Sequence, residues 1–340
     1  MPADRRAIIS LLERFGPLLA LVLLIAGTAI YEAGTVPSGE RAFLTTRNFA
    51  NILGQWSYVG VVALGMTFVI LLGGIDLSVG STVALAAGAS VYAMNSVAER
   101  GDTAAILVAA VVCIVGGAIL GMVNGVVIAK GKIAPFVATL GTLAIYRSLI
   151  LAPAEGSEIR SNVATFGELG GTRINFPWIG PEGESLPIRL GVLVFFGLAI
   201  LAHIILNHTV FGRRVYAIGG NARAARYSGI RLAPISIAVY GICGLTCGIA
   251  ALLNASRLNS VSSSTLGLFY ELDAIAAVVI GGTRLQGGAG RIWGTVIGVL
   301  IMGVVGNMLN MLQVSNFYHG LVKGLIILAA VMVQPRKADV

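Results

Sequence analysis

The sequence predicts an all-α integral membrane protein that crosses the bilayer about ten times, with both termini on the cytoplasmic side. Hydrophobic residues make up 56% of the 340 residues and charged residues only 11%, whereas a soluble domain usually carries about 25% charged residues. Apolar runs of roughly 20 residues recur from end to end, and each can cross a hydrocarbon core about 30 Å thick. Residues 1–340 are therefore predicted to form a single transmembrane domain.

The first apolar run lies close to the N-terminus. Arg5, Arg6 and Arg14 precede an apolar stretch at residues 16–30, a pattern that secretory signal peptides share. The stretch is long, however, and no clean small-x-small cleavage site follows it. We therefore interpret it as an uncleaved first transmembrane helix.

The later spans follow from the same criterion of length and apolarity. The eighth span is short, and its flanks can be broken helix. The ten predicted spans cover residues 16–34, 56–73, 77–96, 104–128, 134–152, 189–207, 234–254, 270–283, 293–312 and 318–334.

The charged residues between spans decide the orientation. Cytoplasmic loops carry an excess of Lys and Arg, so an inside N-terminus predicts basic even-numbered gaps. Those gaps and the tail are basic: Lys130 and Lys132; Arg213, Arg214, Arg223, Arg226 and Arg231; Arg284 and Arg291; Arg336 and Lys337. The outside gaps are mixed or acidic. Because this pattern accounts for the net charge of +8, a nucleic-acid partner is not expected.

Two polar segments between spans are long. Segment 153–188 is external on this topology and is interpreted as a cap or a docking surface. Segment 208–233 is internal and basic; Asn221 can N-cap a short helix at residues 222–227, which Gly229 can end. This segment is either a solvated charge run that sets topology or a docking element for a cytosolic partner.

A short motif recurs in the chain. Gly73–Gly80 and Gly281–Gly288 both fit the pattern G-G-x-x-L-x-x-G, and each lies between two apolar spans. Transporters are often built from repeats with interrupted helices. Common origin and chance in a glycine-rich chain both remain open.

Several ionisable residues fall inside spans or at their edges, where they usually face a polar cavity or a partner. Asp76 precedes Ser78 at a predicted helix break, so it can cap the next helix or contact the substrate. Glu271 and Asp273 open the eighth span, where acids complement the helix dipole. Lys323 and Arg147 complete the set, and Lys323 can pair with one of the acids.

Glycines spaced by four residues form small-residue stripes that permit close helix packing, within the chain or between two copies. The stripes are Gly117, Gly121 and Gly125; Gly244 and Gly248; and Gly290, Gly294 and Gly298.

Motifs for covalent or nucleotide chemistry are missing from the sequence. Gly131-Lys132 is followed by Ile133, so no phosphate-binding loop is present. There is also no His-Glu-x-x-His motif, and the three cysteines lie within apolar runs, where they act as small apolar filler. The chain is expected to be no enzyme, with no ATP site, metal or cofactor of its own.

Four stretches together resemble the permease subunits of bacterial ABC importers for ribose and related monosaccharides. The resemblance covers residues 45–334 and is carried by Gly65–Ile70 running into Gly73–Ser81, by Gly212–Ile230, by Tyr270–Thr283 and by Gly288–Gly298. It implies a permease homodimer or heterodimer in the bacterial inner membrane, with two cytosolic ATPase subunits below and an extracytoplasmic sugar-binding protein above.

The resemblance also assigns candidate residues. Segment 212–230 corresponds to the coupling helix that docks on the ATPase, so the ATPase-coupling candidates are Gly220, Asn221, Ala222, Ala225 and Gly229. Candidates for the pathway or a helix break are Asp76, Ser78, Glu271 and Asp273. The alternative function is a self-sufficient secondary transporter coupled to H⁺ or Na⁺, which would use buried carboxylates as ion sites. The sugar itself, whether pentose, hexose, inositol or polyol, remains open.

Overall fold

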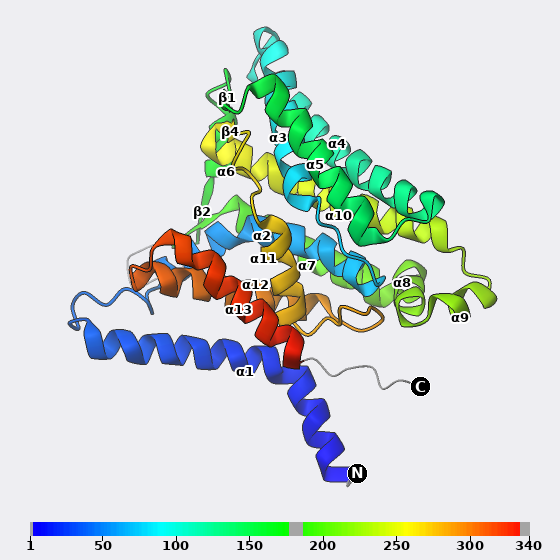
Figure 1. Cartoon of the computed structure of the whole chain (residues 1–340). Coiled ribbons are helices and arrows are strands. Elements are labelled where there is room, and N and C mark those ends of the chain that lie inside the picture. The colour runs from blue at the N-terminus through cyan, green and yellow to red at the C-terminus, as the bar shows by residue number, and fades with distance from the viewer. Residues whose placement is uncertain (1–2, 177–185, 334–340) are drawn as a thin grey trace.

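The computed structural model describes residues 3–176 and 186–333. This part of the chain forms thirteen α-helices, one short 3-10 helix (Ala98–Arg100) and four short strands (Figure 1). Seven helices are long and apolar enough to cross a membrane. They are α1 (Ala3–Thr35, apolar from Phe15), α2 (Thr46–Leu71), α4 (Asp102–Gly131), α5 (Pro135–Ala154), α7 (Leu190–His208), α10 (Leu232–Leu258) and α12 (Ile292–Met311).

The other three predicted spans are also helices, but each is shorter or more polar. They are α3 (Val79–Ser96), α11 (Tyr270–Ile280) and α13 (Asn316–Val333). Most of α3 is buried by protein, so its outer surface has no need to be uniformly apolar. Helix α11 has 11 residues, about 16 Å at 1.5 Å per residue, roughly half of the hydrocarbon thickness. The chain is thus a helical multi-pass protein, and the count of ten full crossings stays a prediction.

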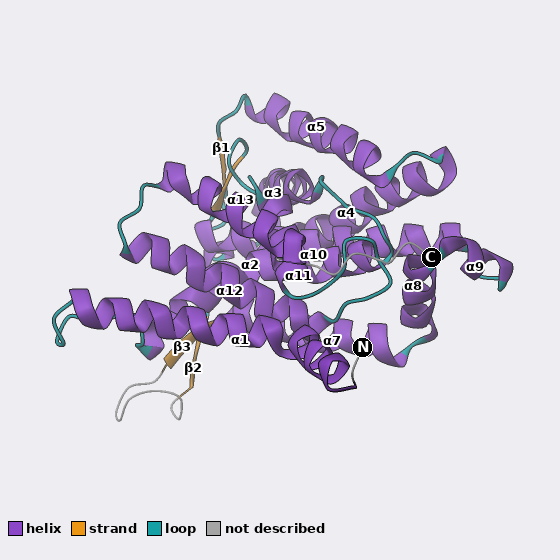
Figure 2. Cartoon of the chain, turned by 60° about the horizontal axis from the view of Figure 1, so that its bottom comes forward, coloured by secondary structure: helices purple, strands orange, loops and turns teal. Residues whose placement is uncertain are grey.

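Helix α2 lies at the centre of the fold. Thr45 caps its start by accepting a hydrogen bond from the backbone N–H of Asn48 at 3.2 Å. Every residue from Ser57 to Leu71 is buried, as expected for a helix that is hydrophobic all round. It packs against α7, α10, α11 and α12, and Figure 2 shows this central group between α5 and α1.

The glycine stripes pack within the chain. Gly117 and Gly121 of α4 lie against the backbone of Gly244 and Gly248 of α10, which confirms the interpretation as an intramolecular contact. In the same way Gly294 of α12 lies against the backbone of Gly281 at the end of α11. Without Cβ atoms the two backbones of each pair come close enough for contact along their length.

The external segment corrects the all-α prediction. Strand β1 (Glu158–Arg160) pairs antiparallel with β4 (Ser260–Ser262), and β2 (Arg173–Phe176) pairs antiparallel with β3 (Leu186–Arg189). A six-residue helix, α6 (Phe166–Gly171), lies between β1 and β2. The β2–β3 register places Ile174 opposite Ile188, a cross-strand pair of the kind that stabilises ribbons. Residues 177–185 of the predicted external segment lie outside the described residues.

Candidate functional site

Helices α2 and α11 end in the same way. At the end of α2, the N–H of Gly73 donates to the Ile70 carbonyl at 2.9 Å and the N–H of Gly74 to the Val69 carbonyl at 3.0 Å. At the end of α11, Gly282 and Thr283 make the corresponding bonds to the Val279 and Val278 carbonyls, at 2.9 and 3.1 Å. Both are Schellman motifs, which need a left-handed residue. Glycine supplies it in each case, with φ of 89° at Gly73 and 87° at Gly282.

The two helix ends are therefore equivalent, but their equivalence is shifted by one residue from the alignment of the sequence motif. The sequence pattern aligns Gly73 with Gly281, whereas the hydrogen bonds make Gly73 equivalent to Gly282. A pattern of identical letters cannot show which glycine has the positive φ. The structure thus shows the same C-terminal capping motif at both helix ends, and their common origin stays a hypothesis.

The predicted short helix of the basic segment is present as α9 (Ala222–Tyr227). The Asn221 side chain accepts hydrogen bonds from the backbone N–H groups of Arg223 and Ala224, both at 3.0 Å, and Gly229 follows the helix with φ of 82°. The cap and the stop are thereby confirmed. An additional helix precedes it: α8 (Val210–Gly220), capped by Thr209, with Val215 and Ile218 buried.

The orientation of α9 differs from the expectation. Ala225 was expected to face a partner, but its side chain is 5% exposed and belongs to the core of this chain. The exposed side of α9 instead presents Ala222, Arg223, Arg226 and Tyr227, and Tyr227 is 90% exposed. A side chain on a helix of six residues can point either way, and packing against α10 settles it. Gly220 also differs from Gly229, because its φ is not positive.

Helix α8 ends against the end of α2 and the loop that follows α11. A Cβ at Gly219 would overlap the carbonyl oxygen of Leu71 and come within 2.6 Å of the Gly288 nitrogen. The N–H of Gly288, in the loop after α11, donates to the same Leu71 carbonyl at 2.9 Å. We call this contact between the backbones of Leu71, Gly219 and Gly288 the glycine junction. Beside it the Tyr216 hydroxyl donates to the Gly290 carbonyl at 2.9 Å.

Sequence reasoning did not single out the residues of the glycine junction. Gly219 lay in the motif of the basic segment and Gly288 in the repeat pattern, yet nothing in the sequence brings the two segments together. Figure 1 shows α8 meeting the end of α2 on the side of the molecule where α9 protrudes. Helix α8 thus contacts the point at which α2 breaks.

Asp76 and Ser78 are buried between α2 and α3. Asp76 Oδ1 accepts hydrogen bonds from the Ser78 backbone N–H at 2.9 Å and from the Ser78 hydroxyl at 2.7 Å. The Asn124 amide donates to Ser78 Oγ at 2.8 Å and, more weakly, to Asp76 Oδ2 at 3.5 Å. Asp76 is 2% exposed and Ser78 fully buried. The carboxylate therefore holds the turn before α3, but it does not cap the helix as predicted, because Ser78 is the N-cap residue and no side chain makes a capping hydrogen bond there.

The acids of α11 lie in its first turn, as expected. Lys323 Nζ lies 2.8 Å from Asp273 Oδ1, so the pairing suggested from the sequence is confirmed. Lys323 also lies 5.2 Å from the centre of the Trp56 ring. Glu271 is only half-buried. Of the carboxylates that an ion-coupled transporter would use, Asp76 and Asp273 are already engaged within the chain.

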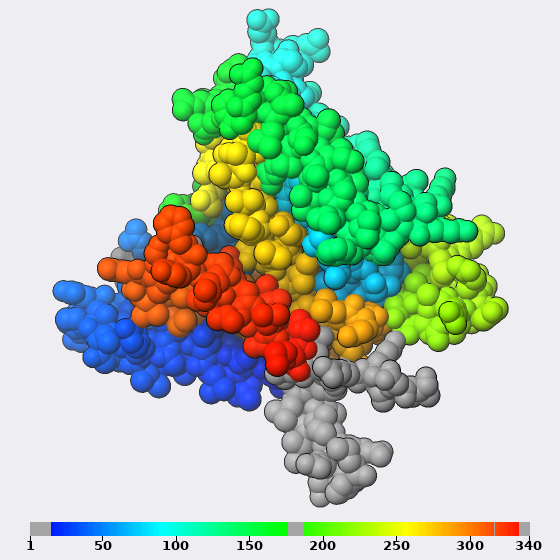
Figure 3. Space-filling model, in the orientation of Figure 1, coloured from blue at the N-terminus to red at the C-terminus, as the bar shows by residue number. Residues whose placement is uncertain are grey.

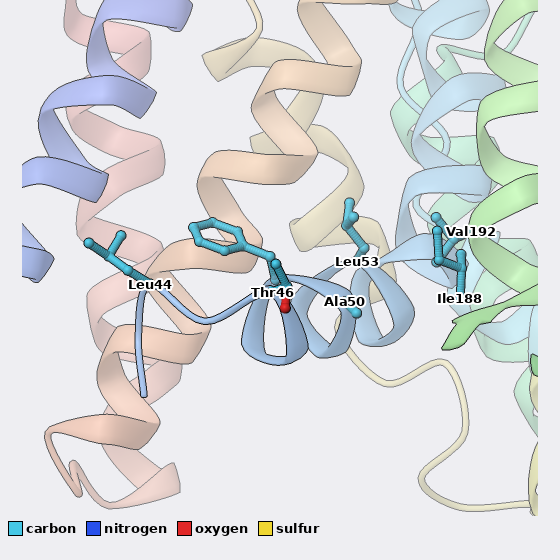
Figure 4. A pocket seen from close by; sticks show the side chains of 7 residues that line it. Leu44, Thr46, Ala50, Leu53, Ile188 and Val192 are labelled. Atoms are coloured by element: carbon cyan, nitrogen blue, oxygen red, sulfur yellow. The ribbon is translucent and has the colours of Figure 1, made fainter. Parts of the chain in front are cut away.

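An apolar pocket lies elsewhere, where the start of α2 meets β3 and α7. Figure 4 shows its lining side chains, of which Thr46 is the only polar one in the picture. The lining residues are Leu44, Thr46, Phe49, Ala50, Leu53, Ile188 and Val192. A sugar needs several hydrogen-bond partners when it leaves water, so this pocket is not suited to hold one.

Comparison with known proteins gives consistent matches over nearly the whole chain. The ribose import permease protein RbsC of Bacillus subtilis is 42% identical over 327 residues, covering 96% of this chain and 94% of that protein. RbsC of Escherichia coli K12 is 41% identical over 325 residues, covering 94% and 93%. The galactose/methyl galactoside import permease protein MglC of Haemophilus influenzae is 35% identical over 319 residues, covering 89% and 91%.

No solved structure matches the chain. The family model described as the branched-chain amino acid transport system / permease component matches residues 48–331, a stretch that includes both helix breaks, α8, α9 and the glycine junction. The chain therefore belongs to this family of membrane transport permeases.

Proposed function

We propose that the chain is the membrane-spanning subunit of an ABC importer for a monosaccharide. The family and the ribose and galactose permeases among its relatives support this class of substrate. The glycine junction is the structural observation that carries the proposal. A chain driven by separate ATPase subunits needs a solid contact between its cytoplasmic surface and its pathway helices, and α8 provides one.

The proposed assembly contains two permease subunits, identical or similar, in the bacterial inner membrane. Two cytosolic ATPase subunits bind below, and a sugar-binding protein binds above at the external segment. The chain crosses the membrane about ten times and has both termini in the cytoplasm. ATP is hydrolysed by the partner subunits, and this chain needs no cofactor of its own.

In the proposed mechanism, the exposed side of α9 docks on the ATPase and α8 moves with it. Because the last turn of α8 touches the Leu71 carbonyl and Gly288 backbone directly, its displacement must move the end of α2 and the loop after α11 as well. Well-packed contacts transmit displacement because they are not freely deformable. The ATPase cycle thereby reorients the pathway between its two faces.

Gly219→Ala tests this proposal. The added methyl group would overlap the Leu71 carbonyl and force α8 away from α2. We expect unchanged co-purification of the ATPase subunits and at least a tenfold loss of sugar uptake in proteoliposomes containing the full complex.

Gly197→Ala in α7 is the control, because a Cβ there meets no atom within 4 Å; its uptake should be normal. Tyr216→Phe removes the hydrogen bond to Gly290 without adding volume, and we expect a smaller loss of uptake with normal abundance. If Gly219→Ala folds and transports at the normal rate, the junction does not couple the subunits and the proposed mechanism is wrong.

A further inference from the structure

The loop that enters α11 exposes apolar side chains beside a strained backbone. Leu268, Phe269 and Leu272 are 49%, 57% and 46% exposed. Phe269 immediately precedes α11 and has φ of 64°, a left-handed conformation that is costly for a bulky residue. The bond from the Asp273 N–H to the Phe269 carbonyl, at 3.0 Å, fixes this conformation. The aromatic ring is thus held at the open end of a half-length helix.

An arginine from α5 lies against the same loop. Arg147 Nη1 donates to the carbonyls of Ser263 at 3.1 Å and Leu266 at 3.0 Å. Its Nε and Nη2 groups make no hydrogen bond to the described residues and are not among the buried unsatisfied atoms. Arg147 lies 12 residues after Pro135, the first residue of α5, hence about 18 Å along that helix. Its remaining donors therefore open onto the outside of the chain at membrane depth.

Glu271 supplies the opposite charge nearby. Its carboxylate lies against the start of α3, since a Cβ at Gly80 would come within 2.7 Å of Oε2. It attracts Arg147 electrostatically, yet the two form no direct ion pair among the described residues. Both side chains consequently keep hydrogen-bonding atoms to offer to a third molecule. In this respect Glu271 differs from Asp76 and Asp273, which are already engaged.

Helices α5, α11 and α13 lie on one face of the molecule, shown in green, yellow-orange and red in Figure 3. Helices α11 and α13 pack together, and Arg147 ties α5 to the loop before α11. An arginine and a glutamate with free atoms are costly against lipid and usually line a polar cavity. The two charged groups therefore indicate a polar cavity beside the loop that enters α11, on a face whose other exposed side chains are largely apolar.

We propose that Arg147, Glu271 and Phe269 form a sugar-contact site on the transport pathway. The inference rests on the proposed function and deepens it. The guanidinium donates hydrogen bonds to hydroxyl groups, the carboxylate accepts them, and the Phe269 ring packs against the apolar C–H face of the sugar ring. A few directional polar groups beside an aromatic surface suit a neutral polyhydroxylated ligand.

Accessibility of Phe269 gives the first test. In the complex with ATPase subunits and binding protein, Phe269→Cys should react with a hydrophilic, membrane-impermeant thiol reagent, and added ribose should slow the reaction. Val111→Cys is the control, because Val111 is 59% exposed on the strongly apolar helix α4. It should not react. An unreactive Phe269→Cys would mean that the ring faces lipid or a second copy, and would overturn the proposed site.

Transport gives the second test. Arg147→Gln and Glu271→Gln should each lower ribose uptake at least tenfold, while the binding protein still stimulates ATP hydrolysis. The neighbouring exposed residue Ser148 provides the control Ser148→Ala, with normal uptake expected. Normal uptake in both charge variants would overturn the sugar site and leave the importer function intact. Absence of any ATPase complex with the unaltered chain would instead contradict the proposed function itself.

Discussion

Two residues of α9 separate packing within the chain from docking on a partner. Ala225 is buried in this chain, whereas Tyr227 is exposed over nine-tenths of its surface. Ala225→Glu would bury an unpaired carboxylate, at a cost of several kcal/mol. We therefore expect low abundance of the permease itself in membrane fractions, measured by immunoblotting.

Tyr227→Ala should act in the opposite way. Exposed tyrosines are frequent hot spots of protein interfaces, and truncating one commonly costs about 2 kcal/mol or more of binding. We expect normal abundance of the permease and a loss of ATPase subunits on purification in mild detergent. Arg231→Ala, also exposed but beyond the end of α9, is the comparison and should retain them. Full retention by Tyr227→Ala would exclude the exposed side of α9 from the docking surface.

Single residues with a local role were predictable from the sequence. Asn221 caps the helix that directly follows it, and Asp76 holds the turn two residues ahead, because both interactions depend on near neighbours. Lys323 and Asp273 are 50 residues apart, but few ionisable groups lie at membrane depth, so their pairing could be suggested. The direction in which the Ala225 side chain points and the contacts of Gly219 depend on packing against other helices. No local sequence pattern predicts either of them.

At the scale of elements, the contact of α4 with α10 rests on glycine. A Cβ at Gly117 would come within 2.5 Å of the Gly244 carbonyl oxygen and 2.8 Å of Gly248 backbone atoms. Gly117→Ala must push the two helices apart, and overpacking of this kind costs about 1–3 kcal/mol. We expect a lower thermal unfolding temperature of the detergent-solubilised protein.

The adjacent residue gives the control. A Cβ at Gly116 meets no atom within 4 Å, and alanine favours the helix over glycine by about 1 kcal/mol. Gly116→Ala should therefore leave the unfolding temperature unchanged or raise it. Equal destabilisation by both substitutions would show that the close contact contributes nothing and that glycine acts only on the helix itself.

The elements were predictable to different degrees. Long apolar helices such as α4 and α7 follow from composition alone, because a run of apolar residues has few alternatives in a bilayer. Helix α8 was missed because its glycines, Gly212, Gly219 and Gly220, argue against an isolated helix. Two of them are present for close packing, since Gly212 lies against Leu206 and Gly219 against Leu71. Packing contacts thus outweigh propensity in this helix.

At the scale of the molecule, the order of the helices was predictable from the sequence, but the strand pairing of segment 153–188 was not. Strands β1 and β4 are separated by about a hundred residues, with Glu158 opposite Ser262. Pairing between three-residue strands leaves no periodic pattern. The fold thereby joins the external segment to the end of α10, next to the loop that enters α11. This ribbon consequently connects the proposed docking segment for the binding protein to the proposed sugar-contact site.

The topology of the molecule is tested by labelling its two ends. Arg223 of α9 and Glu168 of α6 are both exposed, and Figure 1 places α9 and α6 at opposite ends of α10. A label needs an exposed position, and the neighbouring Gly170 does not offer one, because it is buried against Ser256 and Arg257. Cys113, Cys243 and Cys247 are all buried, so replacing them with alanine gives the background for single-cysteine variants.

The basic gaps predict that Arg223→Cys lies in the cytoplasm and Glu168→Cys outside. A membrane-impermeant maleimide added to intact cells should label Glu168→Cys and leave Arg223→Cys unlabelled until the membrane is made permeable. The positive-inside rule carries this expectation, because an orientation with α9 outside would place five arginines of the basic segment there. Labelling of both positions from the same side would rule out an arrangement in which α10 crosses the membrane between α9 and α6.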